Sequence, residues 1–199
     1  MTPTATADAT TTDRILAACR EQILTGGAAS VSTRKVADAA GVPLSQIHYH
    51  FGSKRGLMLA TFAAEDRRLL DRQAAMYAGN EPFAVQWRRA CDHLDQDLES
   101  GYVRMLQEMI TAGYSDDELR AQVRDMLGGW SGLITEALRY HYAHGLRLGG
   151  LTADEACALI AAVFLGAETL CLMGQTDDAT PVRDALRALE PLLAAAQQP

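Results

Sequence analysis

The sequence predicts an all-α protein built from about nine helices. Its 199 residues include 34 alanines and 25 leucines but only 14 isoleucines and valines together, a balance that favours helices over strands. Apolar residues recur at helical spacing, as at Ile15, Cys19 and Ile23. No segment alternates apolar and polar residues for long, and no Asn-Gly or Asp-Gly hairpin turn occurs.

Helix boundaries follow from capping residues and from glycine-rich breaks between apolar segments. Thr152 and Ser115 each precede a glutamate by three residues, which is the pattern of a capping box. Thr180 precedes Pro181 at a further predicted helix start. The predicted helices span residues 12–25, 33–40, 44–50, 54–77, 82–99, 101–112, 116–146, 152–173 and 181–196.

Two of these helices contain residues that disfavour a straight helix. Gly128, Gly129 and Gly132 lie inside the seventh predicted helix, where they weaken it and allow a kink. Pro191 lies inside the last predicted helix and is expected to bend or shorten it. Residues 1–11 are rich in threonine and alanine, so we expect a disordered tail there.

The composition is that of a soluble globular protein and disfavours several other classes. The formal net charge is −7 and 48% of the residues are hydrophobic, but we expect no membrane span because no run of about 18 apolar residues is evident. The N-terminus lacks the features of a signal peptide. The four cysteines form no C-x-x-C pair, which predicts free thiols, no metal site and a cytoplasmic location.

The charge is unevenly distributed along the chain. Residues 1–72 hold 9 lysines and arginines against 7 acidic residues, whereas residues 73–199 hold 9 against 18. Within residues 31–55 the count is 4 against 1, and both lysines of the protein, Lys35 and Lys54, lie there. A basic segment on an acidic body is typical of a DNA-binding head, although a surplus of this size also arises by chance.

Residues 31–58 have the pattern of a helix-turn-helix. Ser32 or Thr33 can cap a short helix, and Gly41 can adopt the left-handed conformation that ends this helix sharply. Pro43 then begins a second short helix. Two short helices joined by a tight glycine turn are the DNA-reading unit of many regulators, although the same motif also occurs as a purely structural element.

The second short helix has an apolar side and a polar side. Ile47 and Phe51, four residues apart, are predicted to face inward. The outward side is rich in hydrogen-bond donors and acceptors that suit the edges of bases in a major groove. Ser53 then caps a long helix that begins with Lys54 and Arg55, so a helix N-terminus and two cations can hold a phosphate.

This segment resembles the TetR family of bacterial transcriptional regulators over roughly residues 13–62. The resemblance rests on short matches at fixed offsets. They are Thr33-Arg34-Lys35-Val36-Ala37, Ala40-Gly41-Val42, Tyr49-His50-Phe51, and Ser53-Lys54 followed by Leu57. The resemblance implies a three-helix DNA-binding domain followed by a helical domain that binds an effector and forms a homodimer.

The resemblance also implies which residues contact double-stranded DNA. They are Thr33, Arg34, Leu44, Ser45, Gln46, His48, Tyr49, His50 and Lys54. The family commonly has tyrosine where this chain has His48, so the contact of His48 can depend on pH. Leu44 can equally pack at the turn, and the histidines and cations can be ordinary solvated side chains.

The C-terminal body contains a segment, residues 152–173, that is apolar nearly all round. One side of such a helix can cover its own domain and the other a partner subunit, although a monomer with a thick core is the alternative. The resemblance implies that the last two long helices form a four-helix bundle in a dimer. The predicted interface residues are Leu159, Val163, Phe164, Leu170, Leu186 and Leu189.

Aromatic and sulfur-containing residues on the central helices predict an effector pocket, although ordinary core is the simpler interpretation of each residue. The predicted pocket residues are Trp87, Cys91, Met105, Met109, Met126, Trp130 and Ile134. We expect a bound effector to change the spacing of the two DNA-binding heads in the dimer.

No enzyme motif accompanies these features, and His141 and His144 are interpreted as surface histidines. The expected domains are a tail at residues 1–11, a helix-turn-helix domain at 12–58 and an effector and dimerisation domain at 59–199, without a cofactor. The sequence therefore predicts a one-component transcriptional regulator, in the simplest case a ligand-responsive repressor of a near-palindromic operator. The alternative is a helical small-molecule-binding or interaction module that does not bind DNA.

Overall fold

The computed structural model describes residues 10–174 and 181–197. Every regular element in these two ranges is helical, which confirms the predicted fold class. The chain divides into two compact units, Met1–Asp66 and Arg67–Pro199. The division falls within one long helix, α4 (Lys54–Tyr77), so each unit contains part of it.

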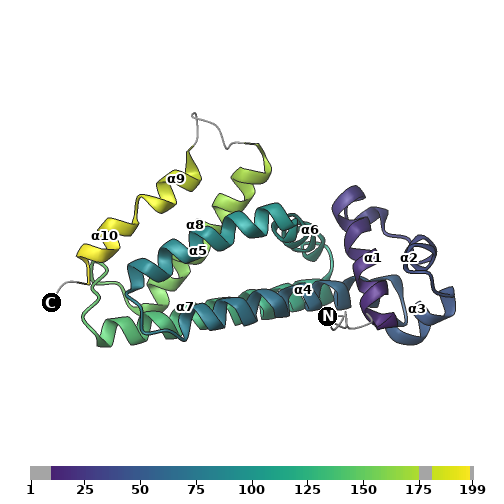
Figure 1. The fold of residues 1–199 in the computed structure, drawn as a ribbon, viewed down its shortest axis with the longest axis horizontal. Helices are drawn as coiled ribbons and strands as arrows, with labels where there is room; N and C mark the ends of the chain where they lie inside the picture. Colours follow the sequence, from purple (N-terminus) through teal and green to yellow (C-terminus); the bar gives the residue numbers. More distant parts are fainter. Residues whose placement is uncertain (1–9, 175–180, 198–199) are drawn as a thin grey trace, which may run out of the picture. The chain divides into compact units, whose positions relative to one another are not determined.

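The first unit contains three helices, a 3-10 turn and the beginning of α4 (Figure 1). They are α1 (Thr11–Gly26), η1 (Ala28–Ser30), α2 (Thr33–Ala40) and α3 (Leu44–Phe51). Thr10 caps α1 in a capping box with Asp13, so helical structure begins inside the predicted tail. Residues 1–9 of that tail lie outside the described residues. Ile15, Ile23 and Leu57 are fully buried and form the core of the unit.

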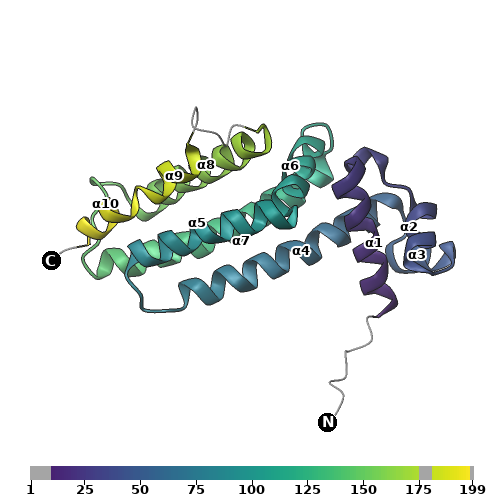
Figure 2. The same cartoon turned by 45° about the horizontal axis from the view of Figure 1, so that its top comes forward.

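The second unit contains the remaining helices and the end of α4. They are α5 (Phe83–Ser100), α6 (Tyr102–Gly113), α7 (Asp117–Ala143), α8 (Ala153–Leu172), α9 (Val182–Arg187) and α10 (Glu190–Ala195). α8 packs against α7, α5 and α9, and α10 packs against α5. Figure 2 shows α8, α9 and α10 together on one side of α5 and α7.

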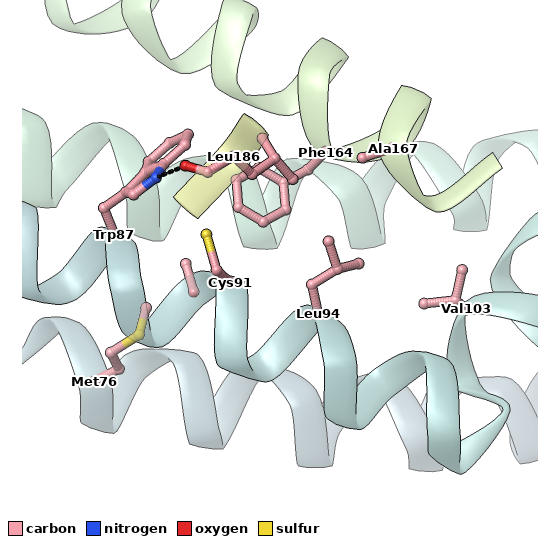
Figure 3. Packing of buried hydrophobic residues seen from close by; sticks show 9 residues of the cluster. Met76, Trp87, Cys91, Leu94, Val103, Phe164, Ala167 and Leu186 are labelled. Atoms are coloured by element: carbon pink, nitrogen blue, oxygen red, sulfur yellow. Dashed lines mark hydrogen bonds between the residues drawn. The ribbon is translucent and has the colours of Figure 1, made fainter. Parts of the chain in front are cut away.

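Aromatic packing joins three helices of the second unit in its core (Figure 3). The indole nitrogen of Trp87 on α5 donates a hydrogen bond to the carbonyl of Leu186 on α9 at 2.7 Å. The same ring meets Phe164 on α8 edge to face, with centroids 5.4 Å apart. A satisfied indole N–H and a favourable ring geometry hold α5, α8 and α9 in a defined arrangement.

The predicted helix starts are confirmed in one case and corrected in another. Thr152 caps α8 in a capping box with Glu155, as expected. At the start of α7 the cap is Asp116 rather than Ser115, because its carboxylate accepts hydrogen bonds from two amides of the first turn, both at 3.1 Å. A charged acceptor at a helix N-terminus also gains from the helix dipole, which favours aspartate over serine here.

Pro191 divides the last predicted helix, as expected from its missing amide hydrogen. α9 ends at Arg187, and α10 starts at Glu190 with the proline in its first turn. A proline is tolerated there because the first amides of a helix have no partner within it. Pro181 precedes α9 as its N-cap, and the predicted cap Thr180 lies outside the described residues.

α8 corrects the expectation that no segment is long and apolar enough to cross a membrane. Its 20 residues contain an 18-residue window with a mean hydropathy of 1.8. One such helix is weak support for a span, since helices that pack against other helices meet the same criterion. Here α8 packs against its own unit with Phe164 and Ala167, while Leu159 and Val163 are exposed.

α7 runs without interruption through its three glycines, and Gly128 offers a test of their cost. A Cβ atom at Gly128 would meet no atom within 4 Å. We expect Gly128→Ala to raise the free energy of unfolding by about 0.5–1 kcal/mol, because glycine is the poorer helix former. Urea denaturation measures this change. The control Gly113→Ala places a Cβ 3.2 Å from the Cα of Arg120, so a gain there and none at Gly128 would contradict the prediction.

Candidate nucleic-acid interface

The turn between α2 and α3 has the geometry that its sequence predicts. Gly41 adopts φ 65° and ψ 39°, which is the left-handed region. The amide of Val42 donates to the carbonyl of Ala37 at 3.0 Å, and that of Gly41 to Asp38 at 3.2 Å. These two bonds satisfy the last carbonyls of α2. Because only glycine adopts this φ without strain, Gly41 determines the direction in which α3 begins.

α3 has one buried and one exposed side. Ile47 is fully buried, and Leu44, Gln46 and Phe51 are partly buried. The remaining side chains are exposed, and Tyr49 exposes 81% of its surface. The exposed residues are Ser45, His48, Tyr49 and His50. A largely exposed tyrosine beside two histidines is available for hydrogen bonds to phosphates or base edges.

The histidine that departs from the family pattern is held near the end of α3. Nδ1 of His48 lies 3.4 Å from the carbonyl oxygen of Gly52 and can donate to it in the Nδ1–H tautomer. This leaves Nε2 of the exposed ring available to solvent or to DNA. The neighbouring rings of Tyr49 and His50 meet edge to face, with centroids 5.0 Å apart.

The cations of this segment lie at the starts of α2 and α4. Arg34 and Lys35 are exposed on α2, where Thr33 is partly buried. Ser53 caps α4, since its hydroxyl oxygen accepts the amide of Gly56 at 3.0 Å. Nζ of the exposed Lys54 donates to the carbonyl of Ala29 at 3.1 Å and so anchors α4 to η1. An ammonium has three donors, so Lys54 can make this bond and still contact a phosphate.

The residues predicted for the effector pocket are core residues of the second unit. Trp87, Cys91, Met105, Met109, Met126 and Ile134 are buried, and Trp130 is partly buried against the same clusters. None of them lines the hollow of about 370 Å³ that the second unit contains between α4 and α7. Packing between helices produces the same periodicity as a pocket wall, so the role of these residues in binding an effector stays a prediction.

The residues predicted for a dimer interface fall into two groups. Leu159, Val163 and Leu189 are exposed, by 55%, 45% and 38%, and Leu170 is partly buried. Phe164 and Leu186 are buried in the core of their own unit, so little of their surface is left for a partner. Leu172, Met173 and Leu192 are further exposed apolar residues that the sequence analysis did not single out.

His141 is not a surface residue, in contrast to its sequence-based interpretation. It exposes only 2% of its surface, and Nε2 lies 3.0 Å from the side-chain oxygen of Gln86. Nδ1 lies 3.3 Å from the amide nitrogen of Gln197. These partners fit a neutral ring protonated at Nε2. Burial, and to a lesser degree His144, lowers the pKa of His141 and so favours this neutral form.

Glu168 is a polar residue on the inner side of α8 that the sequence analysis did not single out. Burial, with a smaller contribution from the charge of Asp97, raises the pKa of its carboxyl to about 7. A hydrogen bond from Gln107 at 3.4 Å partly offsets this effect. A single acid inside an apolar helix was the available signal, but periodicity does not tell which side of the helix such an acid occupies.

Comparisons with known proteins agree with this architecture. Residues 15–61 match the sequence model described as "Bacterial regulatory proteins, tetR family". No curated protein matches the sequence significantly. Among solved structures, a TetR transcription regulator from Haloarcula marismortui superposes with a TM-score of 0.79 and 18% identity, covering 94% of this chain and 98% of its own.

Two further solved structures carry ligands. A transcriptional regulator from Saccharomonospora viridis in complex with choline has a TM-score of 0.77 and 21% identity, covering 89% of this chain and 94% of its own. FadR from Bacillus subtilis in complex with stearoyl-CoA has a TM-score of 0.72 and 18% identity, covering 89% and 96%. At such identities the likeness establishes the fold of the matched part of the chain and nothing further.

A polar, exposed helix that follows a left-handed glycine turn, within the segment that matches the tetR family model, has the arrangement of a DNA-binding helix-turn-helix. Residues 15–61 therefore resemble the tetR family of bacterial regulatory proteins, in agreement with the resemblance found in the sequence.

Proposed function

We propose that the protein is a ligand-responsive repressor that binds a near-palindromic operator as a homodimer in the cytoplasm. The observation that carries this proposal is the exposed polar side of α3, which follows the left-handed turn at Gly41 and lies in the most basic segment of the chain. In a dimer, two such helices would enter successive major grooves about 34–36 Å apart.

The positions of the predicted contact residues determine which of them suit phosphates and which suit bases. Thr33 and Arg34 at the start of α2 and Lys54 at the start of α4 suit phosphate contacts, which position the protein. The α3 side chains suit base edges and the neighbouring backbone, which gives sequence preference. The α3 residues proposed for this role are Leu44, Ser45, Gln46, His48, Tyr49 and His50.

The exposed apolar side of α8 supports the homodimer. Leu159 and Val163 lie one turn apart on this side, together with the small exposed residues Ala158, Ala162 and Gly166. α9 packs against α8, and beyond it Leu189 and Leu192 are also exposed. Two copies that pair these faces would form a four-helix bundle around a shared apolar seam.

A small-molecule effector is proposed for the second unit because two relatives in fold carry small molecules, choline in one and stearoyl-CoA in the other. Effector binding is expected to shift the dimer between a form that fits the operator and one that does not, since a ligand acts only through its different affinity for two states.

Selection of bound sequences from a random duplex pool tests the proposal. We expect enrichment of a near-palindrome whose half-sites lie about 10 base pairs apart, or a multiple of that spacing. A pool that shows no enrichment, or that yields a single half-site without symmetry, would contradict a dimeric operator-binding protein.

Lys54→Ala and Gln46→Ala are expected to affect DNA binding differently. Lys54→Ala removes a phosphate contact, so it should weaken binding to operator and to random duplex alike, by about tenfold. Gln46→Ala removes a base contact, so it should weaken operator binding by about tenfold and leave random duplex unchanged. Fluorescence anisotropy at one salt concentration measures both constants.

The control for these variants is Arg124→Ala, which removes an exposed cation from α7 in the second unit and should leave both constants unchanged. Circular dichroism checks that loss of the Lys54–Ala29 hydrogen bond does not unfold the first unit. If Gln46→Ala weakens binding to operator and random duplex equally, as Lys54→Ala is expected to do, the proposed distinction between base and phosphate contacts is refuted.

A further inference from the structure

The second unit has a hollow of about 370 Å³ between the last turns of α4 and the second half of α7. Short side chains create this space. Ala74 on α4 and Ala78 directly after α4 line one side of the hollow, and Ala137 on α7 lines the other. Hollows of this size accommodate small ligands. All residues that line it belong to one unit, and none is among the effector-pocket residues that the sequence predicts.

The walls of the hollow combine aromatic rings with one negative charge. Tyr77 and Tyr140 contribute the rings, and Glu136 contributes a carboxylate without an ion pair in the described part of the chain. No lysine, arginine or histidine lines the hollow. The nearest arginine on the same helix, Arg139, is directed to Asp154 at 3.0 Å.

Tyr77 presents a neutral ring to the hollow. Burial raises the pKa of Tyr77 well above its usual value. The hydroxyl of Tyr140 donates to the side-chain oxygen of Asn80 at 3.2 Å, which joins α7 to the segment after α4 at one side of the hollow. The faces of neutral tyrosine rings carry a partial negative charge that attracts cations, and an adjacent carboxylate adds to this attraction.

We infer that this hollow is the effector site of the regulator and that it takes a small organic cation, an ammonium group on a short apolar or hydroxylated body. The part of this inference that makes the hollow an effector site rests on the proposed function as a ligand-responsive repressor. The carboxylate of the exposed Glu136 would repel an anion and attract a cation, and a neutral ligand would gain nothing from it.

A chain of hydrogen bonds connects the wall of the hollow to the C-terminal segment. The carbonyl of Gly79 in the wall accepts the side-chain amide of Gln86 at 3.2 Å. Gln86 binds His141, which in turn binds Gln197 two residues after α10. The side-chain oxygen of Gln197 accepts the amide of Phe83 at 2.9 Å. A ligand that displaces the segment around Gly79 therefore acts on the C-terminal helices, which carry part of the proposed dimer face.

Calorimetric titration of the full-length protein with choline, and with its uncharged isostere 3,3-dimethylbutan-1-ol, tests this inference. We expect choline to bind at least about tenfold more tightly than the isostere. Glu136→Gln and Tyr140→Leu should each weaken choline binding by about tenfold, whereas Asp125→Asn, which removes an exposed acid elsewhere on α7, should not. Choline should also weaken operator binding by the parent protein and not by Glu136→Gln.

Equal binding of choline and the isostere, no binding up to about 10 mM, or unchanged choline binding by Glu136→Gln would overturn the inference. Choline binding at Glu136 without any effect on operator affinity would overturn the effector role. Duplex binding without choline is measured in parallel. If the protein binds its operator but ignores choline, only this inference fails; if it binds no duplex at all, the proposed function fails.

Discussion

Val163→Arg is expected to convert the protein into a folded monomer that binds its operator about 100-fold more weakly. Val163 lies in the centre of α8 and exposes 45% of its surface, so arginine fits the isolated subunit without disturbing its core. In the dimer the same position would place two arginines near the symmetry axis, where unpaired charges are costly to bury. A monomer carries one DNA-binding head, so it loses the gain in operator affinity that two linked heads provide.

Sedimentation equilibrium and operator titration measure the two effects, and circular dichroism verifies the helical content. Gln122→Arg is the matched control, because it adds the same charge at an exposed position of α7 outside the proposed face. A Val163→Arg variant that remains dimeric would show that the subunits pair through another surface. Leu159→Arg, on the adjacent turn of the same face, should reproduce the monomer.

Glu168→Gln is expected to raise the free energy of unfolding by about 2 kcal/mol at pH 8 and to leave it nearly unchanged near pH 4.5. Burial raises the pKa of Glu168 from 4.5 to about 7, so the native protein favours the protonated acid. Stability from this group is therefore complete below its unfolded pKa and is lost as the pH rises through about 7. Glutamine keeps the shape and the neutral state at every pH.

Urea denaturation of both proteins between pH 4.5 and 8 measures this difference. Glu99→Gln on the exposed surface of α5 is the control and should show no such pH dependence relative to the parent. A constant difference between parent and Glu168→Gln across this range would mean that Glu168 has the same pKa in the native and the unfolded protein, contrary to the raised native pKa.

The DNA-binding head was predictable because its signals are local. Gly41 terminates α2 through its own backbone conformation, and Ile47 is the buried member of a short amphipathic helix. Both features depend on residues within a few positions of each other. The start of α7 shows the limit, since Ser115 and Asp116 are both good caps and only the local backbone selects between them.

The helices of the body were predictable from the sequence, whereas the side that each helix buries was not. α8 is apolar nearly all round, so periodicity could not tell that Phe164 faces its own core while Val163 is exposed. The sequence could not predict the hollow near Glu136, because it is lined by alanines of α4 and α7 that are distant from each other in the sequence. His141 was misplaced for a related reason, as its partners Gln86 and Gln197 come from other segments.

The most direct test of the central claim, that α3 and its neighbouring cations form a DNA-reading surface, is the salt dependence of binding to the selected duplex. Arg34 and Lys54 from two subunits make four phosphate contacts in this account, which predicts a slope of about −3.6 in log K against log salt. The Lys54→Ala variant loses one phosphate contact in each subunit, so its slope should be shallower by about 1.8. A slope near zero, or no binding at about 50 mM salt, would contradict the claim.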